Sequence, residues 1–315
     1  MSEQKIVDCT LRDGGLVNNF FFTDEFVKDL YEMNIAAGVD YMEFGYKADK
    51  DMFDEKEFGK WKFCKEEDIR AIVGNNPTSM KISVMADIGR CNIKRDLLPK
   101  KDSVIDMVRV ATYAETIQEA VETANYCHSL GYETTVNVMA VSKTDSNILE
   151  HALSCLAGCD ADAIYLVDSF GAFYPSDIRE LTKKYISYCN GAKSKKVGIH
   201  AHNNQQLAFA NTLEALSNGA QYLDVTVSSL GRGAGNCPTE LLLGALKENG
   251  KYDIEPVLSF IEKHILTLRR EGLKWGYDIP YLLTGNTNKH PSAAIQFIKE
   301  GNTDYTTFHQ GLKRA

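Results

Sequence analysis

Short runs of apolar residues alternate with longer amphipathic segments along the first 250 residues of the chain. The short runs are rich in Val, Ile and Tyr and are bounded by Gly, Asp, Asn or Lys, a pattern typical of buried strands. The eight predicted strands are Lys5–Thr10, Tyr41–Gly45, Lys81–Ala86, Met107–Ala111, Glu133–Val141, Ala163–Val167, Val197–His202 and Tyr222–Ser228.

Between these strands, apolar residues recur at the spacing of one helix face. The predicted helices are Asp24–Ala37, Thr116–Leu130, Ser146–Ala157, Pro175–Cys189, Gln205–Ser217 and Pro238–Glu248. A strand–helix unit that repeats eight times over about 250 residues predicts an α/β fold of the (β/α)8 TIM-barrel type. A doubly wound open sheet is the alternative, although the first turn lacks the G-x-G-x-x-G fingerprint of dinucleotide-binding sheets.

The pattern divides the chain into two expected regions. Residues 1–250 are predicted to form the catalytic barrel, and residues 251–315 a short helical extension that packs on it. The extension contains the predicted helices Ile254–Glu271 and Pro291–Lys299. The segment Gly276–Pro291 mixes aromatic residues with Gly, Asn and His, which favours a loop near a functional site over a plain helix.

Composition narrows the classes of function. The 315 residues are 44% hydrophobic and carry a net charge of −8 with both signs spread along the chain. This balance argues against nucleic acid as a partner, offers no basic patch for a membrane surface, and includes no apolar run long enough to span one. The eight cysteines are scattered and do not resemble a disulfide framework, so we expect a reducing cytoplasm.

Two histidines near the end of the seventh predicted strand are candidate metal ligands. His200 and His202 are spaced i, i+2, and alternate side chains of a strand share one face. Asp13 follows the end of the first predicted strand, and the carboxyl ends of barrel strands meet on one rim. One carboxylate and two imidazoles leave coordination positions open, as in a catalytic site. No cysteine-rich shell is present, so Mn²⁺ or Mg²⁺ fits better than a structural Zn²⁺.

Further polar residues fall on the same predicted rim: Arg12, Glu43, Asp87, Asp168, Ser169, Arg232 and Asn236. Buried charges are costly unless they are paired or bind a metal, so this set indicates a cation and an anionic substrate. The turn Gly231–Gly235 either brings the backbone close to a ligand or only makes a tight turn. Asn236 is either a further oxygen ligand or the N-cap of the helix that begins near Pro238.

Four separated stretches can be compared together with known families. They are Asp-Cys-Thr-Leu-Arg-Asp-Gly-Gly from Asp8 to Gly15, Val-Asp-Ser-Phe-Gly from Val167 to Gly171, His200-x-His202, and Leu-Gly-Arg-Gly-Ala-Gly-Asn from Leu230 to Asn236. With Glu43, they resemble the DRE-TIM metallolyases, or HMGL-like superfamily, over roughly residues 5–250. That superfamily includes hydroxymethylglutaryl-CoA lyase, the 4-hydroxy-2-oxovalerate aldolases, and the isopropylmalate and homocitrate synthases.

The resemblance implies a divalent metal at the positions that match Asp13, His200 and His202, joined in some members by the position of Asn236. It implies a carbon–carbon lyase nearest the 4-hydroxy-2-oxovalerate aldolases. Such an enzyme makes or breaks a bond through the metal-held enolate of a 2-oxo acid such as pyruvate, with an aldehyde as second partner. Arg12 would stabilise the enolate.

Other positions have expected supporting roles in this chemistry. Glu43 would organise the site by pairing with nearby polar groups. Asp168, Ser169 and Gly233, together with Arg12, are expected to contact the substrate. We also expect a homo-oligomer, with a partner enzyme as a further possibility.

One position departs from the aldolase branch. That branch has a histidine, regarded as the base, three residues after the metal-binding aspartate, and this chain has Leu16 there. A side chain therefore cannot take the proton at this position. The alternatives are a water on the metal, or Tyr281 or His290 from the extension.

Two other functions stay open at this point. One is a Claisen-type acyl-CoA condensing enzyme, although no basic cluster for CoA is evident and the 65 residues from 251 to 315 are too few for the synthases' regulatory domain. The other is a non-catalytic barrel homologue, which only Leu16 favours.

Overall fold

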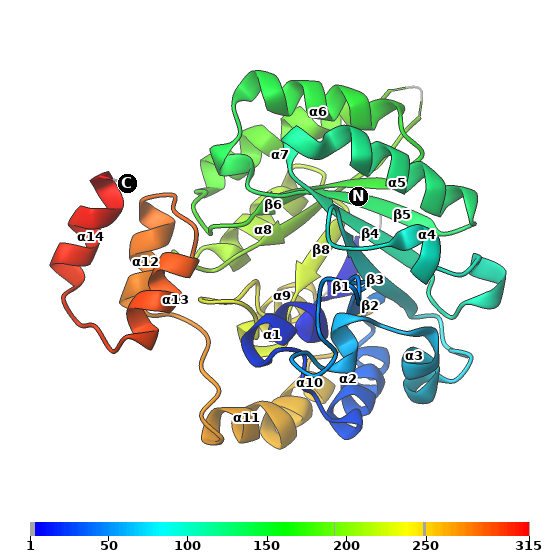
Figure 1. Ribbon diagram of the computed structural model, residues 1–315, viewed down its shortest axis with the longest axis horizontal. Helices are drawn as coiled ribbons and strands as arrows, with labels where there is room; N and C mark the ends of the chain where they lie inside the picture. The colour runs from blue at the N-terminus through cyan, green and yellow to red at the C-terminus, as the bar shows by residue number, and fades with distance from the viewer. Residues whose placement is uncertain (1–3, 192, 248–249, 315) are drawn as a thin grey trace.

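The computed structural model describes residues 4–191, 193–247 and 250–314. Its eight parallel strands close into a barrel in the order β1 to β8, with β1 pairing to β8, as Figure 1 shows. The strands are β1 Lys5–Asp8, β2 Tyr41–Tyr46, β3 Lys81–Asp87, β4 Met107–Thr112, β5 Glu133–Val138, β6 Ala163–Asp168, β7 Lys196–Ala201 and β8 Tyr222–Val225. The predicted (β/α)8 barrel is confirmed.

Helices surround the barrel and continue beyond it (Figure 1). They are α1 Thr10–Asn18, α2 Asp24–Ala36, α3 Glu66–Val73, α4 Ile93–Asp96, α5 Ile117–Ser129, α6 Ser146–Gly158, α7 Pro175–Cys189, α8 Ala208–Ser217, α9 Thr239–Leu246, α10 Glu255–Phe260, α11 Leu266–Arg270, α12 Ile279–Asn286, α13 Ser292–Lys299 and α14 Tyr305–Arg314. A π-helical turn, Ile261–Ile265, joins α10 to α11. The predicted end of one helix, Glu248, lies outside the described residues.

The first strand ends earlier than the sequence predicts. The Asp8 carboxylate accepts hydrogen bonds from the backbone N–H of Thr10 at 3.2 Å and from its hydroxyl at 2.7 Å. These bonds turn the chain directly into α1, so Arg12 and Asp13 stand on a helix whose start lies over the barrel rim. The cause is side-chain capture of the backbone, which competes with strand pairing.

The segment Gly276–Pro291, for which a loop was predicted, is partly helical in the structure. It contains the helix α12, and the side chain of Asp278 accepts the backbone N–H of Ile279 at its start. Pro280 stands in the first turn, where a missing N–H costs nothing. Of the Gly and Asn residues that suggested a loop, Gly276 precedes the helix, Gly285 and Asn286 are its last two residues, and Asn288 follows it.

One layer of the barrel interior is charged. Glu43, Arg109, Tyr165 and Asp224 come from β2, β4, β6 and β8, and side chains from alternate strands form such layers in this fold. Arg109 donates to Glu43 at 2.9 Å and to Asp224 at 2.6 Å, and its guanidinium lies 4.5 Å from the centre of the Tyr165 ring. A fully buried arginine is thereby paired on two sides.

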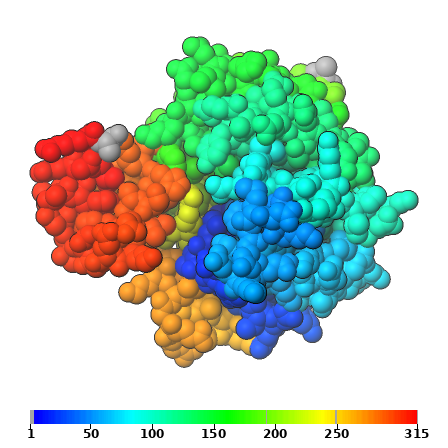
Figure 2. Space-filling model, in the orientation of Figure 1, coloured from blue at the N-terminus to red at the C-terminus, as the bar shows by residue number. Residues whose placement is uncertain are grey.

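The C-terminal helices lie beside the barrel. Figures 1 and 2 show α12, α13 and α14 as an orange-to-red lobe that projects from one side, while α10 and α11 lie along another edge. Gly285 of α12 fits closely against the loops after β6 and β7, because a Cβ there would meet the Asn204 Cβ at 2.8 Å and the Gly171 carbonyl oxygen at 3.1 Å. Within the described residues, no helix combines the length and apolar character needed to cross a membrane.

Candidate metal centre

Three predicted ligands meet at the carboxyl end of the barrel. Donor atoms of Asp13, His200 and His202 all lie within 4.8 Å of one another, and all three residues are buried. The Nε2 atom of His200 is 3.1 Å from Oδ2 of Asp13. Two imidazole nitrogens and a carboxylate oxygen converging on one point form a typical site for a divalent cation with open positions.

The strand-8 loop brings a fourth group to the same point. His202 lies just beyond β7 and forms an antiparallel bridge with Asn236. The Asn236 Nδ2 atom is 3.3 Å from Oδ2 of Asp13, 3.1 Å from Nε2 of His200 and 3.4 Å from Nδ1 of His202. Asn236 does not cap the next helix, because the residue at the N-cap of α9 is Pro238.

The amide of Asn236 fits a role as a cation ligand. Its Oδ1 atom is buried and has no hydrogen-bond partner in the described structure. A half-turn of the amide exchanges Oδ1 with Nδ2, which directs the oxygen at Asp13 and the two imidazoles. The donor set would then be two nitrogens and two oxygens.

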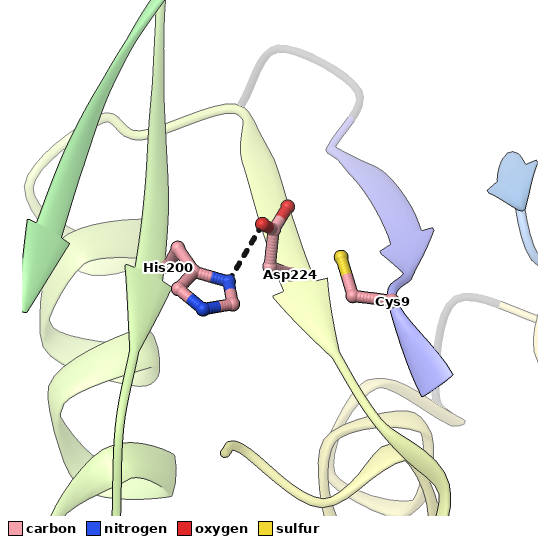
Figure 3. Close-up of side chains that lie close together, drawn as sticks. All are labelled: Cys9, His200 and Asp224. Atoms are coloured by element: carbon pink, nitrogen blue, oxygen red, sulfur yellow. Dashed lines mark hydrogen bonds and ion pairs between the residues drawn. The ribbon is translucent and has the colours of Figure 1, made fainter. Parts of the chain in front are cut away.

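His200 is fixed from behind by a second carboxylate. Figure 3 shows its Nδ1 atom directed at Asp224, 2.9 Å from Oδ2, with Cys9, the residue directly after β1, on the other side of Asp224. Because Nδ1 is engaged with a carboxylate, Nε2 is left for a metal, which is how such ligands are usually oriented.

Cys9, His200 and Asp224 form a second group of possible ligands within 4.8 Å. We assign them a positioning role instead. Burial, together with the negative charges of Asp224 and Glu43, holds the pKa of the Cys9 thiol well above its ordinary value, whereas a metal needs the thiolate. Asp224 is also already occupied by Arg109 and His200.

The guanidinium of Arg12 is held by two hydrogen bonds at the edge of the candidate metal centre. Its Nε donates to Glu43 at 2.8 Å, and its Nη1 donates to Asp13 at 2.8 Å. In the part of the chain that the structure describes, no protein group bonds to its Nη2. Glu43 also accepts from Arg109, so the charged interior layer positions both Arg12 and, through Asp224, His200.

The charges of the site follow from this packing. Burial alone would raise the pKa of Asp13, but Arg12 and both histidines outweigh it and hold the pKa well below its usual range. Burial lowers the pKa of His202 well below its ordinary value. Asp13 is therefore ionised and His202 neutral at pH 7, which are the protonation states that bind a metal.

A pocket opens directly above these residues. It encloses about 490 Å³ of empty space, part of which is open to solvent. The lining residues are Arg12, Asp13, Leu16, Tyr46, Met85, Asp87, Ala111, Asn137, Met139, Val167, Ser169, His200, His202 and Arg232. Leu16 therefore faces the site, and the position of the missing histidine is filled by an apolar side chain.

The predicted substrate-contacting residues are not all in the pocket. Ser169 lines it, with its hydroxyl accepting the Ala140 N–H at 2.9 Å. Asp168 is not among the lining residues: its carboxylate accepts the N–H groups of Ala172 at 2.9 Å and Phe173 at 3.3 Å and shapes the β6 loop. Burial raises its pKa to about 7. Gly233 also lies outside the lining.

The two acid–base candidates from the extension lie near the rim and not among the lining residues. The ring of Tyr281 is adjacent to Gly233, where a Cβ would meet it at 3.1 Å. The His290 ring lies edge-on to Phe170 with the ring centres 5.7 Å apart, and its Nδ1 bonds to Ser292 at 2.8 Å. Tyr46 and Asp87 are in the pocket instead.

Sequence reasoning missed Arg109, Tyr165 and Asp224, and counted Arg232 among the charges of the rim without giving it a role of its own. Arg109 and Asp224 each interrupt an apolar strand with a charge, in Met-Val-Arg-Val-Ala-Thr and Tyr-Leu-Asp-Val. Such a charge must find a partner inside the barrel, so the two interruptions could have identified the pair.

Comparison with known proteins supports the same class. A family model described as HMGL-like matches residues 3–265. The chain is 32% identical over 246 residues to a 4-hydroxy-2-oxovalerate aldolase from Carboxydothermus hydrogenoformans, covering 78% of this chain and 71% of that protein. It is 31% identical over 252 residues to an oxaloacetate decarboxylase from Mycobacterium tuberculosis, covering 79% and 71%.

Solved structures share the fold. The N-terminal domain of a candidate aldolase from Bacteroides vulgatus superposes with a TM-score of 0.82 at 28% identity, covering 94% of this chain and 96% of that one. A Brucella melitensis HMG-CoA lyase superposes with a TM-score of 0.69 at 18% identity, covering 86% of this chain and all of that one, and shows the fold alone.

Barrel, ligand geometry and relatives together define a metal-dependent carbon–carbon lyase with a small-molecule substrate. The chain belongs to the HMGL-like family, within the DRE-TIM superfamily. The resemblance found in the sequence is confirmed, and the non-catalytic alternative loses its support.

Proposed function

We propose that this enzyme binds a 2-oxo acid such as pyruvate at Asp13, His200, His202 and Asn236 with Mn²⁺ or Mg²⁺, and cleaves or forms the bond next to its C3 carbon. Aldol cleavage of a 4-hydroxy-2-oxo acid, releasing an aldehyde, is the reaction that we place first. The observation that carries this proposal is the convergence of three ligand side chains within 4.8 Å at the floor of a pocket edged by Arg12.

A divalent cation bound here would polarise the keto carbonyl and offset negative charge that develops on its oxygen. Arg12 has the complementary role on the protein side. Its Nε and Nη1 are held by Glu43 and Asp13, so its remaining N–H groups are oriented before substrate arrives. Donors fixed in advance stabilise developing charge without reorganising.

The proton transfers need a further group, because Leu16 supplies none. Asp87 lines the pocket, and burial raises the pKa of its carboxyl, which improves its match to neutral pH. Tyr46 also lines the pocket, but burial raises the pKa of its hydroxyl to about 12, so it is a donor and not a base. We place Asp87 first, and keep Tyr281 and His290 as proton carriers that would have to act from the rim.

A second reaction is favoured by Leu16 itself. Decarboxylation of oxaloacetate breaks the bond between C3 and C4 and releases CO₂, and the electron pair stays on the pyruvate enolate. This step has no hydroxyl proton to remove, so it does not need the missing base. Only the later protonation of the enolate carbon needs a donor, and Tyr46 could supply it.

The test measures metal content and the exchange of pyruvate methyl protons in D₂O. We expect wild-type protein dialysed against Mn²⁺ to hold one cation per chain and to exchange protons, since exchange requires enolate formation and a group that takes up and returns the methyl proton, but no aldehyde. The double variant His200→Ala, His202→Ala should do neither. Full metal loading of that variant would contradict the proposal.

The matched control replaces two exposed histidines, His128→Ala and His151→Ala, and should leave both readings unchanged. Exchange in wild-type protein that persists after removal of metal with a chelator would also contradict the proposed centre. Product analysis with oxaloacetate and with 4-hydroxy-2-oxopentanoate then separates the two reactions.

We further propose that the enzyme acts as a homo-oligomer in a reducing cytoplasm. Support comes from the eight cysteines, all free, and from exposed apolar side chains on or near α12 and α13, namely Tyr277, Ile279 and Ile295. Light scattering on the purified protein tests the oligomer.

A further inference from the structure

We propose that Arg232 recognises a second carboxylate on the substrate, at the end away from the keto acid. The enzyme would then prefer dianionic 2-oxo acids over those with a neutral far end. This inference rests on the proposed function, because the keto-acid end is taken to lie at the metal centre.

Arg232 is built into the wall of the same pocket. It belongs to the loop between β8 and α9, and its backbone N–H donates to Oδ1 of Asp13 at 3.2 Å. Its Nη2 donates to the carbonyl oxygen of Ser169 at 3.2 Å. Arg232 is therefore fixed at two points. Its backbone is held beside the candidate ligand Asp13, and its guanidinium is held by Ser169, the residue directly after β6.

The guanidinium has no acidic partner of its own. The other arginine of the pocket, Arg12, is paired with Asp13 and Glu43 at 2.8 Å each. For Arg232, no carboxylate among the described residues forms such a pair, and its Nε is buried without a hydrogen-bond partner. A guanidinium charge without a counter-ion in the protein favours an anionic ligand, which would form charge-assisted hydrogen bonds with it.

The geometry favours a carboxylate as the ligand group. One Nη2 hydrogen is held by Ser169, whereas Nη1 has no protein partner among the described residues and is not a buried atom, so the planar edge formed by Nη1 and Nη2 keeps N–H groups for a ligand. Such an edge matches the two oxygens of a carboxylate, and these charge-assisted bonds are the strong ones. In an aldol substrate, this second carboxylate would lie remote from the bond that breaks. Binding energy gained at such a remote group can orient the reacting carbons.

Two stable five-carbon acids test the inference directly. 2-Oxoglutarate and 2-oxopentanoate differ only in a carboxylate for a methyl group, and neither has the 4-hydroxyl needed for cleavage. By calorimetry on Mn²⁺-loaded protein, we expect 2-oxoglutarate to bind at least about 10-fold more tightly. Arg232→Met should abolish this preference and change the Kd of 2-oxopentanoate by less than about threefold, while Arg232→Lys should keep part of the preference.

Arg179→Met is the control, because Arg179 is an exposed arginine on α7 paired with Glu214, and it should leave both affinities unchanged. Equal binding of the two acids to wild-type protein, failure of both to bind, or a preference that survives Arg232→Met would each overturn the inference. The proposed function is tested separately by pyruvate proton exchange in wild-type protein. If wild-type protein shows no proton exchange but its preference for 2-oxoglutarate still depends on Arg232, the proposed function is rejected and the carboxylate site is retained.

Discussion

A single imidazole, that of His200, connects the candidate metal centre to the charged layer inside the barrel. Its Nε2 faces Asp13, and its Nδ1 is 2.9 Å from Asp224. Asp224 is in turn held by Arg109 at 2.6 Å. The orientation of the ligand thus depends on residues that touch neither metal nor substrate, and partners of this kind tune metal affinity.

We therefore expect Asp224→Asn to weaken Mn²⁺ binding by about 10- to 100-fold, the usual cost of losing such a partner. The amide keeps the shape of the carboxylate but not its charge, so the imidazole loses basicity and Arg109 loses one of its two acidic partners. Metal titration by calorimetry measures the effect. Tyr165→Phe is a matched control in the same layer, because the Tyr165 hydroxyl has no hydrogen-bond partner. Unchanged affinity in Asp224→Asn would show that Asp224 serves only the fold.

At the scale of single residues, the sequence predicted which candidate ligands lie together, but not the residues that orient them. His200 and His202 could be paired from their i, i+2 spacing because a strand puts both on one face. Asp224 and Arg109 lie on different strands, 115 positions apart, and only barrel closure brings them together. Arg232 was hidden for a similar reason, since its lack of an acidic partner is a property of the folded pocket.

At the scale of elements, periodicity predicted the strands because each is buried on both faces and reads as a short apolar run. It failed where polar side chains set the boundary. No helix was predicted before Asp24, because the segment after β1 holds two glycines and two charges, yet this segment forms α1. Burial against the rim and the two hydrogen bonds that Thr10 donates to the Asp8 carboxylate outweigh the low helix propensity of glycine.

The β1–α1 junction should make stability depend on pH. Burial raises the pKa of Asp8 to about 7, from 3.8, despite its bonds to Thr10. The folded protein therefore holds this proton over a range where the unfolded chain has lost it, so Asp8 lowers stability as pH rises from about 4 to 7. Relative to Asp8→Asn, the free energy of unfolding of the wild type should fall by about 3 kcal/mol between pH 5 and pH 8. Urea unfolding at a series of pH values measures the difference, and a constant difference would contradict the assignment.

At the scale of the whole molecule, the extension and the barrel meet beside the site. The Asn204 amide, two residues after His202, donates to the Tyr281 carbonyl oxygen at 3.3 Å and to the Thr284 hydroxyl at 3.4 Å. The loop after β7 therefore carries the candidate metal ligand His202 at one end and holds α12 at the other. Amphipathic periodicity predicts the helices of the extension but not where they dock, because docking depends on fits such as that of Gly285.

Gly285→Ala tests whether the extension contributes to the chemistry. The added methyl would meet the Asn204 Cβ at 2.8 Å, so α12 must move away from the rim and take Tyr281 with it. If a group from the extension carries a proton, pyruvate proton exchange should fall by about 10-fold or more, in line with the size of acid–base effects. Affinity for Mn²⁺ should stay within about threefold, because the ligands belong to the barrel. Gly311→Ala on α14, where a methyl meets nothing within 4 Å, is the matched control. Exchange that stays at the wild-type rate would restrict the extension to packing and leave proton transfer to groups in the pocket, with Asp87 as the first to test.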